Sequence, residues 1–335
     1  MRKIRFLTPV LWIFVGLLFW WAWRDISLPQ LWESLHHFTP LSLGILGIIN
    51  AAILLLFGSR WWLILRALGY DLPYLSLAKY RLASFGVSYF TPGPQFGGEP
   101  LQVYFLHKNH QVPTETALAS VSLDKLLEML ANFTFLVFGV MIILWQGLFF
   151  DGIRGTVLSF SVGILLLILG YSTLLWMGKT PLTWIWGLLP LNKRDHDSPS
   201  LFRQALLGAE SQIGAFIRQK PRALFQSSLL SVIIWASLFG EYALALKFLG
   251  LETSFINILA IIIFARLAFL TPLPGGLGAL EAGQVFAMQA LGFDPVLGVS
   301  MSLFIRLRDT FFALIGLWLG SVKSHKKNFT EKKYV

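Results

Sequence analysis

The sequence predicts an all-α polytopic membrane protein, with about six transmembrane helices and two re-entrant pairs of broken helices in an inverted repeat. Three observations support this fold class. The 335 residues are 56% hydrophobic and 13% charged, and the charged fraction is about half that of a soluble domain. Apolar runs of about 20 residues recur, long enough to cross a hydrocarbon core about 30 Å thick. Two similar motifs rich in proline and glycine, "TPGPQFGGE" from Thr91 and "TPLPGGLGALE" from Thr271, interrupt apolar stretches.

Six continuous apolar segments are predicted to cross the membrane. They are 6–23, 41–65, 115–145, 156–177, 222–249 and 296–321. The first follows Arg2, Lys3 and Arg5, and no small-residue cleavage site follows it, so we expect an uncleaved helix. The stretches 78–107 and 255–291 contain the two motifs. Each is predicted to form two half-length helices around a break.

The placement of lysine and arginine predicts the orientation. With six crossings and two re-entrant pairs, most Lys and Arg residues fall on one side, in both termini and in the loops 66–81, 107–112 and 178–222. The other side receives Arg24, Arg154 and Lys247. This bias predicts that both termini are cytoplasmic. The net charge of +10 therefore reports loop topology, and we expect no nucleic-acid partner.

The whole chain, 1–335, is predicted to form a single membrane domain whose one sizeable polar connection is the cytoplasmic loop 178–221. From Leu201 onward, apolar residues recur in this loop at helical spacing. This pattern predicts an amphipathic helix on the membrane surface. A plain tether is the alternative, and nothing in the loop has catalytic spacing.

The two motifs belong to longer similar units, predicted at 41–146 and 222–321. Asp124 lies 25 residues after Glu99, and Arg306 lies 25 residues after Glu281, so each glutamate is followed at one distance by a charged cluster. Three crossings separate the motifs, and this odd number gives the units opposite orientations. Inverted repeats with broken helices are typical of transporters. Chance similarity within a low-complexity apolar chain is the alternative.

The breaks themselves are candidate binding elements. Their predicted key residues are Gly97, Gly98, Pro272, Pro274, Gly275, Gly276 and Gly278. Proline and glycine stop a helix and leave backbone groups unpaired, which lipid cannot satisfy, so the breaks should line a cavity or be buried in protein. Half-helices that begin at the breaks would point their N-termini inward, which suits an anion such as phosphate. Alternatively, the glycines only allow close packing.

Charged residues within the apolar segments are the candidate substrate-binding residues. They are Glu99, Asp124, Lys125, Glu128, Arg266, Glu281, Arg306, Arg308 and Asp309. Each charge costs about 2.5–3.5 kcal/mol at mid-bilayer, so these residues should pair or face water. We expect a polar cavity open to lipid where the breaks meet, lined by Glu99, Glu281, Arg306 and Arg308, with Lys125 and Arg266 as secondary residues.

A buried ion-pair network that only fixes the fold is the alternative. It would pair Asp309 with Arg306 and place two acidic residues around Lys125. The glutamates at the breaks could also cap their own half-helices. Glu241 is expected near the outer end of its span and ranks lower as a site residue.

Catalytic and cofactor motifs are not evident in the sequence. His107 and His110 in "HKNH" lack further ligands and are predicted to be solvated, so no metal is expected. The chain has no cysteine, which excludes thiolate chemistry and disulfides. There is no HExxH, no G-x-S-x-G and no phosphate-binding loop. We therefore expect no cofactor, no catalytic residues and no ATP-driven step, and a transport protein is favoured over an enzyme.

Four segments resemble the lysylphosphatidylglycerol synthase transmembrane-domain family, also called the flippase-like domain family. They are "GGEPLQVYFL", "SLDKLLEML", "PLPGGLGALEAG" and "FIRLRDTFFALIGL". The third is the most specific, and the resemblance covers nearly the whole chain. The family pattern is Gly-Arg-x-Gly-Glu followed by a basic residue. This chain departs from it, because the arginine is missing and Gln102 stands in place of the basic residue. The pattern Glu-Arg-x-x-Asp is conserved in charge from Asp124 to Glu128.

The resemblance implies a function in lipid movement. The best-known members carry an aminoacyl-transferase domain that makes lysyl-phosphatidylglycerol, and their membrane domain is implicated in moving that lipid between leaflets. With the chain ending at Val335, we expect the flippase half alone, in the cytoplasmic membrane of a prokaryote. The lost basic positions weaken the expectation of the same head group.

We therefore expect a flippase or scramblase for a polar-headed, anionic or modified membrane lipid, with passive or ion-coupled movement. The resemblance leaves room for a lipid-synthesising enzyme as a partner. Two alternatives stay open. One is a membrane-embedded lipid-modifying transferase, and the other is a secondary transporter of a small solute.

Overall fold

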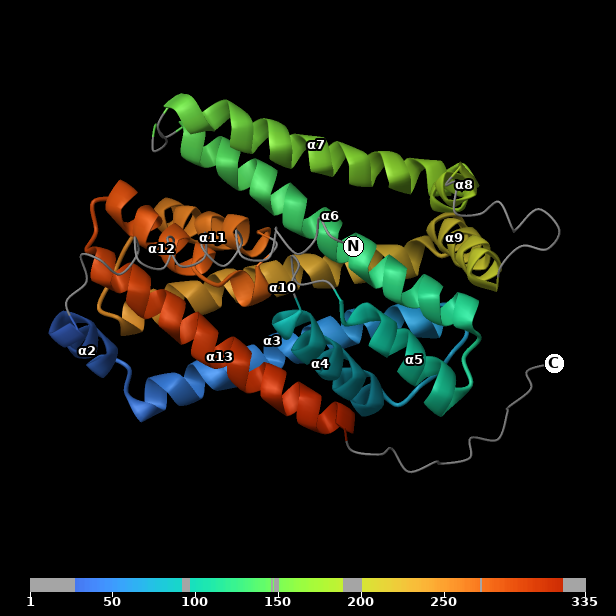
Figure 1. Cartoon of the computed structure of the whole chain (residues 1–335), viewed down its shortest axis with the longest axis horizontal. Coiled ribbons are helices and arrows are strands. Elements are labelled where there is room, and N and C mark those ends of the chain that lie inside the picture. The colour runs from blue at the N-terminus through green and yellow to red at the C-terminus, as the bar shows by residue number, and fades with distance from the viewer. Residues whose placement is uncertain are drawn as a thin grey trace, which may run out of the picture.

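The computed structural model (Figure 1) describes residues 28–91, 97–145, 147, 151–188, 201–271 and 273–321. Within these ranges all regular secondary structure is helical, which confirms the predicted all-α class. The predicted first span, 6–23, lies outside the described residues, as do both chain ends.

Five long helices occupy the ranges predicted for the other spans. They are α3 (Pro40–Ala67), α6 (Thr114–Trp145), α7 (Asp151–Trp176), α10 (Pro221–Phe248) and α13 (Pro295–Ser321). Among the described residues, four helical segments are long and apolar enough to cross a membrane: Pro40–Ala67, Thr114–Trp145, Leu158–Trp176 and Pro221–Phe248. Helix α13 has 27 residues but carries Arg306, Arg308 and Asp309 in its middle. The number of crossings stays a prediction.

Local sequence signals explain where the long helices begin and end. The Thr39 hydroxyl caps α3 by accepting a hydrogen bond from the Ser42 amide at 3.1 Å, and Pro40 occupies the first turn. Pro221 occupies the first turn of α10 in the same way. Helix α3 ends before Gly69, whose φ of 96° a residue with a side chain rarely adopts.

The shorter helices include both predicted broken pairs. The first pair is α4 (Tyr74–Phe90) and α5 (Glu99–His110), and the second is α11 (Phe255–Phe269) and α12 (Ala279–Ala290), with the 3₁₀ turn η2 (Pro274–Gly276) between them. The others are α2 (Leu28–His36), α8 (Pro181–Leu188) and α9 (Leu201–Gln219). The sequence predicted a helix at the position of α9, but α2 and α8 were missed.

The two broken pairs lie toward opposite ends of the bundle. Helices α4 and α5 lie toward the end that carries α8 and α9, whereas α11 and α12 lie toward the end that carries α2 (Figure 1). Helix α4 packs along α13, and α11 packs against α6. Each broken pair therefore contacts the last long helix of the other predicted unit.

Glycines allow the half-helices of one unit to pack closely against the long helix of the other. A Cβ at Gly86 of α4 would meet the Ala313 carbonyl oxygen, and a Cβ at Gly316 of α13 would overlap the Leu82 carbonyl. On the other side, a Cβ at Gly139 of α6 would overlap the Ile263 side chain of α11. Such close approach is usual where helices pack within membranes.

The outward faces of the long helices remain apolar. Leu41 and Ile48 of α3, Phe138 of α6, Leu167 of α7 and Leu307 of α13 are all more than half exposed. Large exposed apolar surfaces are unusual in soluble monomers. These exposed apolar surfaces are consistent with a helical bundle surrounded by lipid. Many polar and charged side chains are buried inside the bundle.

Candidate functional site

At the end of the first break, the amides of Gly97 and Gly98 bond side chains of α5 and α4. Gly97 has a φ of 134°, and its amide donates to Glu99 Oε2 at 2.8 Å. The Gly98 amide donates to the Ser88 hydroxyl at 2.9 Å, and a Cβ at Gly98 would overlap the Ser84 carbonyl. Glu99, in the first turn of α5, therefore bonds the backbone just before the helix, and α5 has no side-chain cap. Residues 92–96 lie outside the described part of the chain.

The second break is built from glycines in the left-handed region. Gly275, Gly276 and Gly278 have φ values of 54°, 64° and 75°, and Pro274 begins the 3₁₀ turn between α11 and α12. A Cβ at Gly275 would lie 3.1 Å from the ring of Tyr89, the penultimate residue of α4. The second break therefore contacts the C-terminal end of α4, the helix that precedes the first break. Pro272 lies outside the described residues.

Arg306 ties the second break to α13. Its guanidinium donates to Glu281 Oε2 at 2.7 Å and contacts Glu281 Oε1 through Nε. It also donates to the carbonyls of Gly275 and Gly276, both at 3.2 Å. Glu281 is 1% exposed. One arginine therefore satisfies a buried carboxylate and two carbonyl groups that the break leaves without helical partners.

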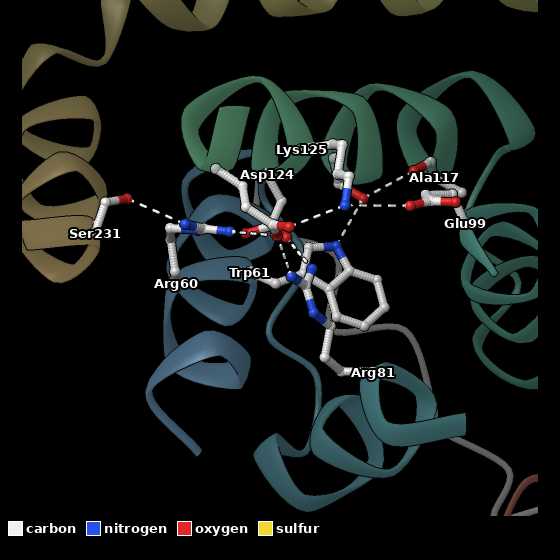
Figure 2. Close-up of polar contacts among 10 residues, drawn as sticks. Arg60, Trp61, Arg81, Glu99, Ala117, Asp124, Lys125 and Ser231 are labelled. Atoms are coloured by element: carbon white, nitrogen blue, oxygen red, sulfur yellow. Dashed lines mark hydrogen bonds and ion pairs between the residues drawn. The ribbon is translucent and has the colours of Figure 1, made fainter. Parts of the chain in front are cut away.

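A network of five charged residues joins α3 and α4 to α6; we call it the α6 cluster. It consists of Arg60, Arg81, Asp124, Lys125 and Glu128. Arg60 Nε donates to Asp124 Oδ1 at 2.7 Å, and Arg81 bonds both acidic residues. Lys125 donates to Glu128 at 2.9 Å. Figure 2 shows Arg60 and Arg81 approaching Asp124 from two different helices.

The α6 cluster also contacts α10 and the first break. Arg60 Nη1 donates to Ser231 Oγ of α10 at 3.1 Å. Lys125 Nζ lies 3.5 Å from Glu99 Oε1, which connects α6 to the first break (Figure 2). The glutamates at the two breaks therefore contact the following long helix in equivalent ways, Glu99 through Lys125 and Glu281 through Arg306.

A second network, the α13 cluster, consists of Asn50, Glu241, Arg308 and Asp309. Arg308 Nη1 bonds Glu241 Oε1, while its Nε and Nη2 lie 2.9 Å and 2.8 Å from Asp309 Oδ1. Asn50 donates to the same Glu241 oxygen at 2.6 Å. Helices α3, α10 and α13 are thereby joined through one buried carboxylate, since Glu241 is 1% exposed.

Both clusters face a cavity of about 430 Å³ enclosed by α3, α4, α6, α7, α10, α11 and α13. Five cationic side chains line it: Arg60, Arg81, Lys125, Arg266 and Arg308. Two carboxylates, Glu128 and Asp309, also line it. Aromatic rings, including Phe57, Phe85 and Trp235, form much of the remaining wall. The cavity wall is thus largely apolar, and among the charged groups that line it the cations outnumber the carboxylates.

Arg266 differs from the other cations of the cavity. Its guanidinium carbon lies 4.8 Å from the centre of the Trp235 ring, a cation–π arrangement. Its Nε is buried without a hydrogen-bond partner. Across the described ranges, Arg266 takes part in none of the ion pairs that hold Arg60, Arg81, Lys125 and Arg308.

In the structure, the residues predicted to bind substrate lie in three places: on the cavity wall, buried behind it, and at the breaks. Lys125, Glu128, Arg266, Arg308 and Asp309 line the cavity. Asp124 is fully buried behind its arginine partners. Glu99, Glu281 and Arg306 lie at the breaks and are not among the lining residues. Asp309 pairs with its neighbour Arg308, whereas the sequence suggested Arg306.

Sequence reasoning missed three residues of the site. Arg60 falls within the predicted span 41–65 but is not among the candidate residues, Arg81 falls in the predicted loop 66–81, and Glu241 ranks lower as a site residue. The structure places Arg81 within α4 and gives all three buried or half-buried ion pairs. Arg60 and Glu241 do stand out as charges within apolar runs, a signal that could have found them.

Comparison with known proteins places the chain in a family. The sequence model of the lysylphosphatidylglycerol synthase TM region matches residues 10–316. The chain belongs to this family. The lysylphosphatidylglycerol synthase TM region takes its name from an enzyme of membrane-lipid metabolism, so membership relates this chain to membrane lipids.

Relatives of the chain include archaeal membrane proteins. A UPF0104 membrane protein of Methanothermobacter thermautotrophicus is 24% identical over 309 residues, which cover 90% of each chain. A UPF0104 membrane protein of Pyrococcus horikoshii is 24% identical over 307 residues, which cover 88% of this chain and 89% of the relative. The similarity to these relatives thus extends over nearly the full length of both proteins.

Proposed function

We propose that this protein is a lipid translocase, a flippase or scramblase that moves a polar-headed lipid between the leaflets of a prokaryotic cytoplasmic membrane. The observation that carries the proposal is the charged cavity within an otherwise apolar helical bundle. A lipid can keep its tails in the bilayer while it crosses, so only its head group needs a polar path. Membership of a family named after a lipid synthase supports the same substrate class.

The charges of the cavity favour an anionic head group, or a modified one that retains an anionic part. Five cations and two carboxylates face the cavity, and the carboxylates of Asp124 and Glu241 lie behind their arginine partners. Arginine binds phosphate and carboxylate groups through paired hydrogen bonds. The carboxylates hold the cationic side chains in position between substrates.

The arrangement of helices supports an inverted repeat, with α3–α6 as one unit and α10–α13 as the other. Each unit runs long helix, two half-helices, long helix. In both, the glutamate that follows the break contacts the unit's last long helix. We propose that the broken pairs are re-entrant from opposite faces and that the end carrying α8 and α9 is cytoplasmic, together with both termini.

In the proposed topology, the two charged clusters lie at different depths in the membrane. Arg60 lies in the C-terminal part of α3, and Glu241 lies in the C-terminal part of α10, which runs antiparallel to α3 (Figure 1). The α6 cluster is therefore nearer the end with α8 and α9, and the α13 cluster is nearer the end with α2. A head group passing through the cavity would meet one cluster and then the other.

A leaflet-exchange assay tests the proposal. The purified protein is placed in vesicles that contain fluorescent lipids with anionic, zwitterionic or sugar head groups, and a membrane-impermeant reductant bleaches the label in the outer leaflet. Protein-dependent loss of the inner-leaflet label is expected for at least one lipid. Accumulation of a soluble solute without movement of any lipid would contradict the proposal and favour a solute transporter.

Two tryptophan substitutions on α10 provide a matched comparison. Leu238 lines the cavity, so Leu238→Trp should fill it and strongly reduce lipid movement. Ile233 lies on the same helix and is 41% exposed on the outer surface. Ile233→Trp should keep the wild-type rate. Equal rates in both variants would show that lipid does not use this cavity.

A further inference from the structure

We propose that Arg266 binds the phosphate of the transported lipid, which makes phosphate-bearing lipids the substrate class. The inference rests on the proposed function, because it concerns the same cavity. Three observations carry it: the position of Arg266 on the cavity wall, its lack of an ion-pair partner among the described residues, and its packing on Trp235.

The other lining cations are already neutralised. Arg60 and Arg81 share Asp124 and Glu128, and Lys125 also pairs with Glu128. On the opposite side, Glu241 and Asp309 hold Arg308. A substrate would have to break one of these pairs before it could bind to such a residue. Arg266 is free to accept an anion without that loss.

A purely structural role would not explain Arg266. An uncompensated charge inside a membrane protein is costly, and such charges normally pair or mark a functional pathway. The half-buried guanidinium is stabilised by a ring face, whereas its Nε lacks a partner. An anion that enters the cavity would supply both a countercharge and an acceptor for the unpartnered Nε–H group.

The packing on Trp235 also orients the guanidinium. A guanidinium that lies against an aromatic ring keeps its N–H groups directed from its edges, which is the geometry of bidentate bonds to phosphate oxygens. Trp235 itself packs on Phe135 of α6, with ring centres 4.0 Å apart. The ring is therefore held in place from behind, and Arg266 does not need to reorganise when the anion arrives.

A stability measurement in detergent separates this inference from a structural role. Arg266→Gln breaks no ion pair among the described residues, so its melting temperature should equal or exceed that of the wild type. Arg308→Gln leaves Glu241 and Asp309 without their cation, so its melting temperature should fall. A fall for Arg266→Gln as large as that for Arg308→Gln would contradict the inference, because Arg266 would then have an essential structural partner.

Ligand binding is measured on the same proteins with three probes. Short-chain phosphatidylglycerol should raise the melting temperature of the wild type, and Arg266→Gln should bind it about tenfold more weakly or worse, as expected for loss of a charge-assisted bond. Arg266→Lys should bind with intermediate affinity. A phosphate-free short-chain glucosyl diacylglycerol should give no shift that depends on Arg266. If inorganic phosphate protects as well as the lipid does, the lipid assignment is wrong.

Leaflet exchange distinguishes failure of this inference from failure of the proposed function. The wild type should move fluorescent phosphatidylglycerol faster than the phosphate-free glycolipid, and Arg266→Gln should lose this preference. Equal movement of both lipids in wild type and variant would overturn the role of Arg266 but leave the translocase standing. If no lipid moves while phosphatidylglycerol still protects the wild type through Arg266, the translocase fails and the anion site remains.

Discussion

At the scale of single residues, Arg306 has a structural environment that differs from that of the cavity residues. It bonds the buried Glu281 and two glycine carbonyls of the second break. Breaks within a membrane need such partners, because lipid offers none. Arg306 is therefore expected to hold the break closed, while the cavity residues contact substrate.

Replacing Arg306 tests this assignment. Arg306→Gln should destabilise the protein by about 3–5 kcal/mol, because it leaves the Glu281 carboxylate buried without its partner. Purified yield and melting temperature are the measurements, and Arg306→Lys should lie between the variant and the wild type because it keeps the charge but loses the fork of donors. A stable Arg306→Gln protein without transport would instead indicate that Arg306 contacts the substrate.

How far the sequence predicts the site depends on the residue. Lys125, Arg266 and Arg308 were predicted from charges within apolar runs, which must pair or face water in a membrane, and all three line the cavity. The sequence could not assign partners. Asp124 pairs with Arg60, which lies 64 positions earlier in the chain. Such a pairing depends on which faces of the two helices pack together. Glu241 was ranked low for its predicted depth, but hydrogen bonding to Asn50 and pairing with Arg308 make it central.

At the scale of helices, the crossing of α4 and α13 depends on glycine. Gly86 and Gly316 lie at the contact, and each meets backbone atoms of the opposite helix. These two helices belong to different proposed units, so their contact holds the units together. A flexible side chain can move aside, whereas a backbone carbonyl cannot, which makes this contact sensitive to a single methyl group.

Alanine substitutions test the crossing. Gly316→Ala should destabilise the protein by about 1–3 kcal/mol, as overpacking usually does. Gly240→Ala in α10 is the matched control, because a Cβ there has no neighbour within 4 Å. It should be neutral or stabilise by up to about 1 kcal/mol through helix propensity. Similar melting temperatures for the two variants would contradict the close backbone contact.

Helix positions were predictable where length and composition act locally. The long helices and both broken pairs follow from apolar runs and from Pro and Gly signals. Helix α8 was missed because its stability comes from a distant residue. Glu210 of α9 accepts hydrogen bonds from the Leu182 and Thr183 amides at 2.9 Å and 2.8 Å, and from the Thr183 hydroxyl at 2.7 Å. A carboxylate at a helix N-terminus is stabilising, but sequence distance hides the pair.

At the scale of the whole molecule, the proposed mechanism depends on how the two units are placed in the membrane. If both broken pairs are re-entrant, the cavity is bounded by one pair from each face, and the two charged clusters lie at different depths. If instead one pair crossed completely, every helix after it would reverse, and the basic loops would be divided between the two sides. The topology therefore decides whether the cavity can connect the two leaflets.

Single cysteines can establish this topology, since the natural chain has none. Asp71 precedes α4 and Lys108 lies in the last turn of α5, whereas Glu252 precedes α11 and Asp294 follows α12; all four are exposed. In intact cells, a membrane-impermeant thiol reagent should label Glu252→Cys and Asp294→Cys. It should label Asp71→Cys and Lys108→Cys only after permeabilisation, because positive-inside loops are cytoplasmic. Both members of a pair should therefore share one face. Labelling of the two members of either pair from opposite faces would show that this pair crosses the membrane, which would overturn the inverted repeat and the path between leaflets that depends on it.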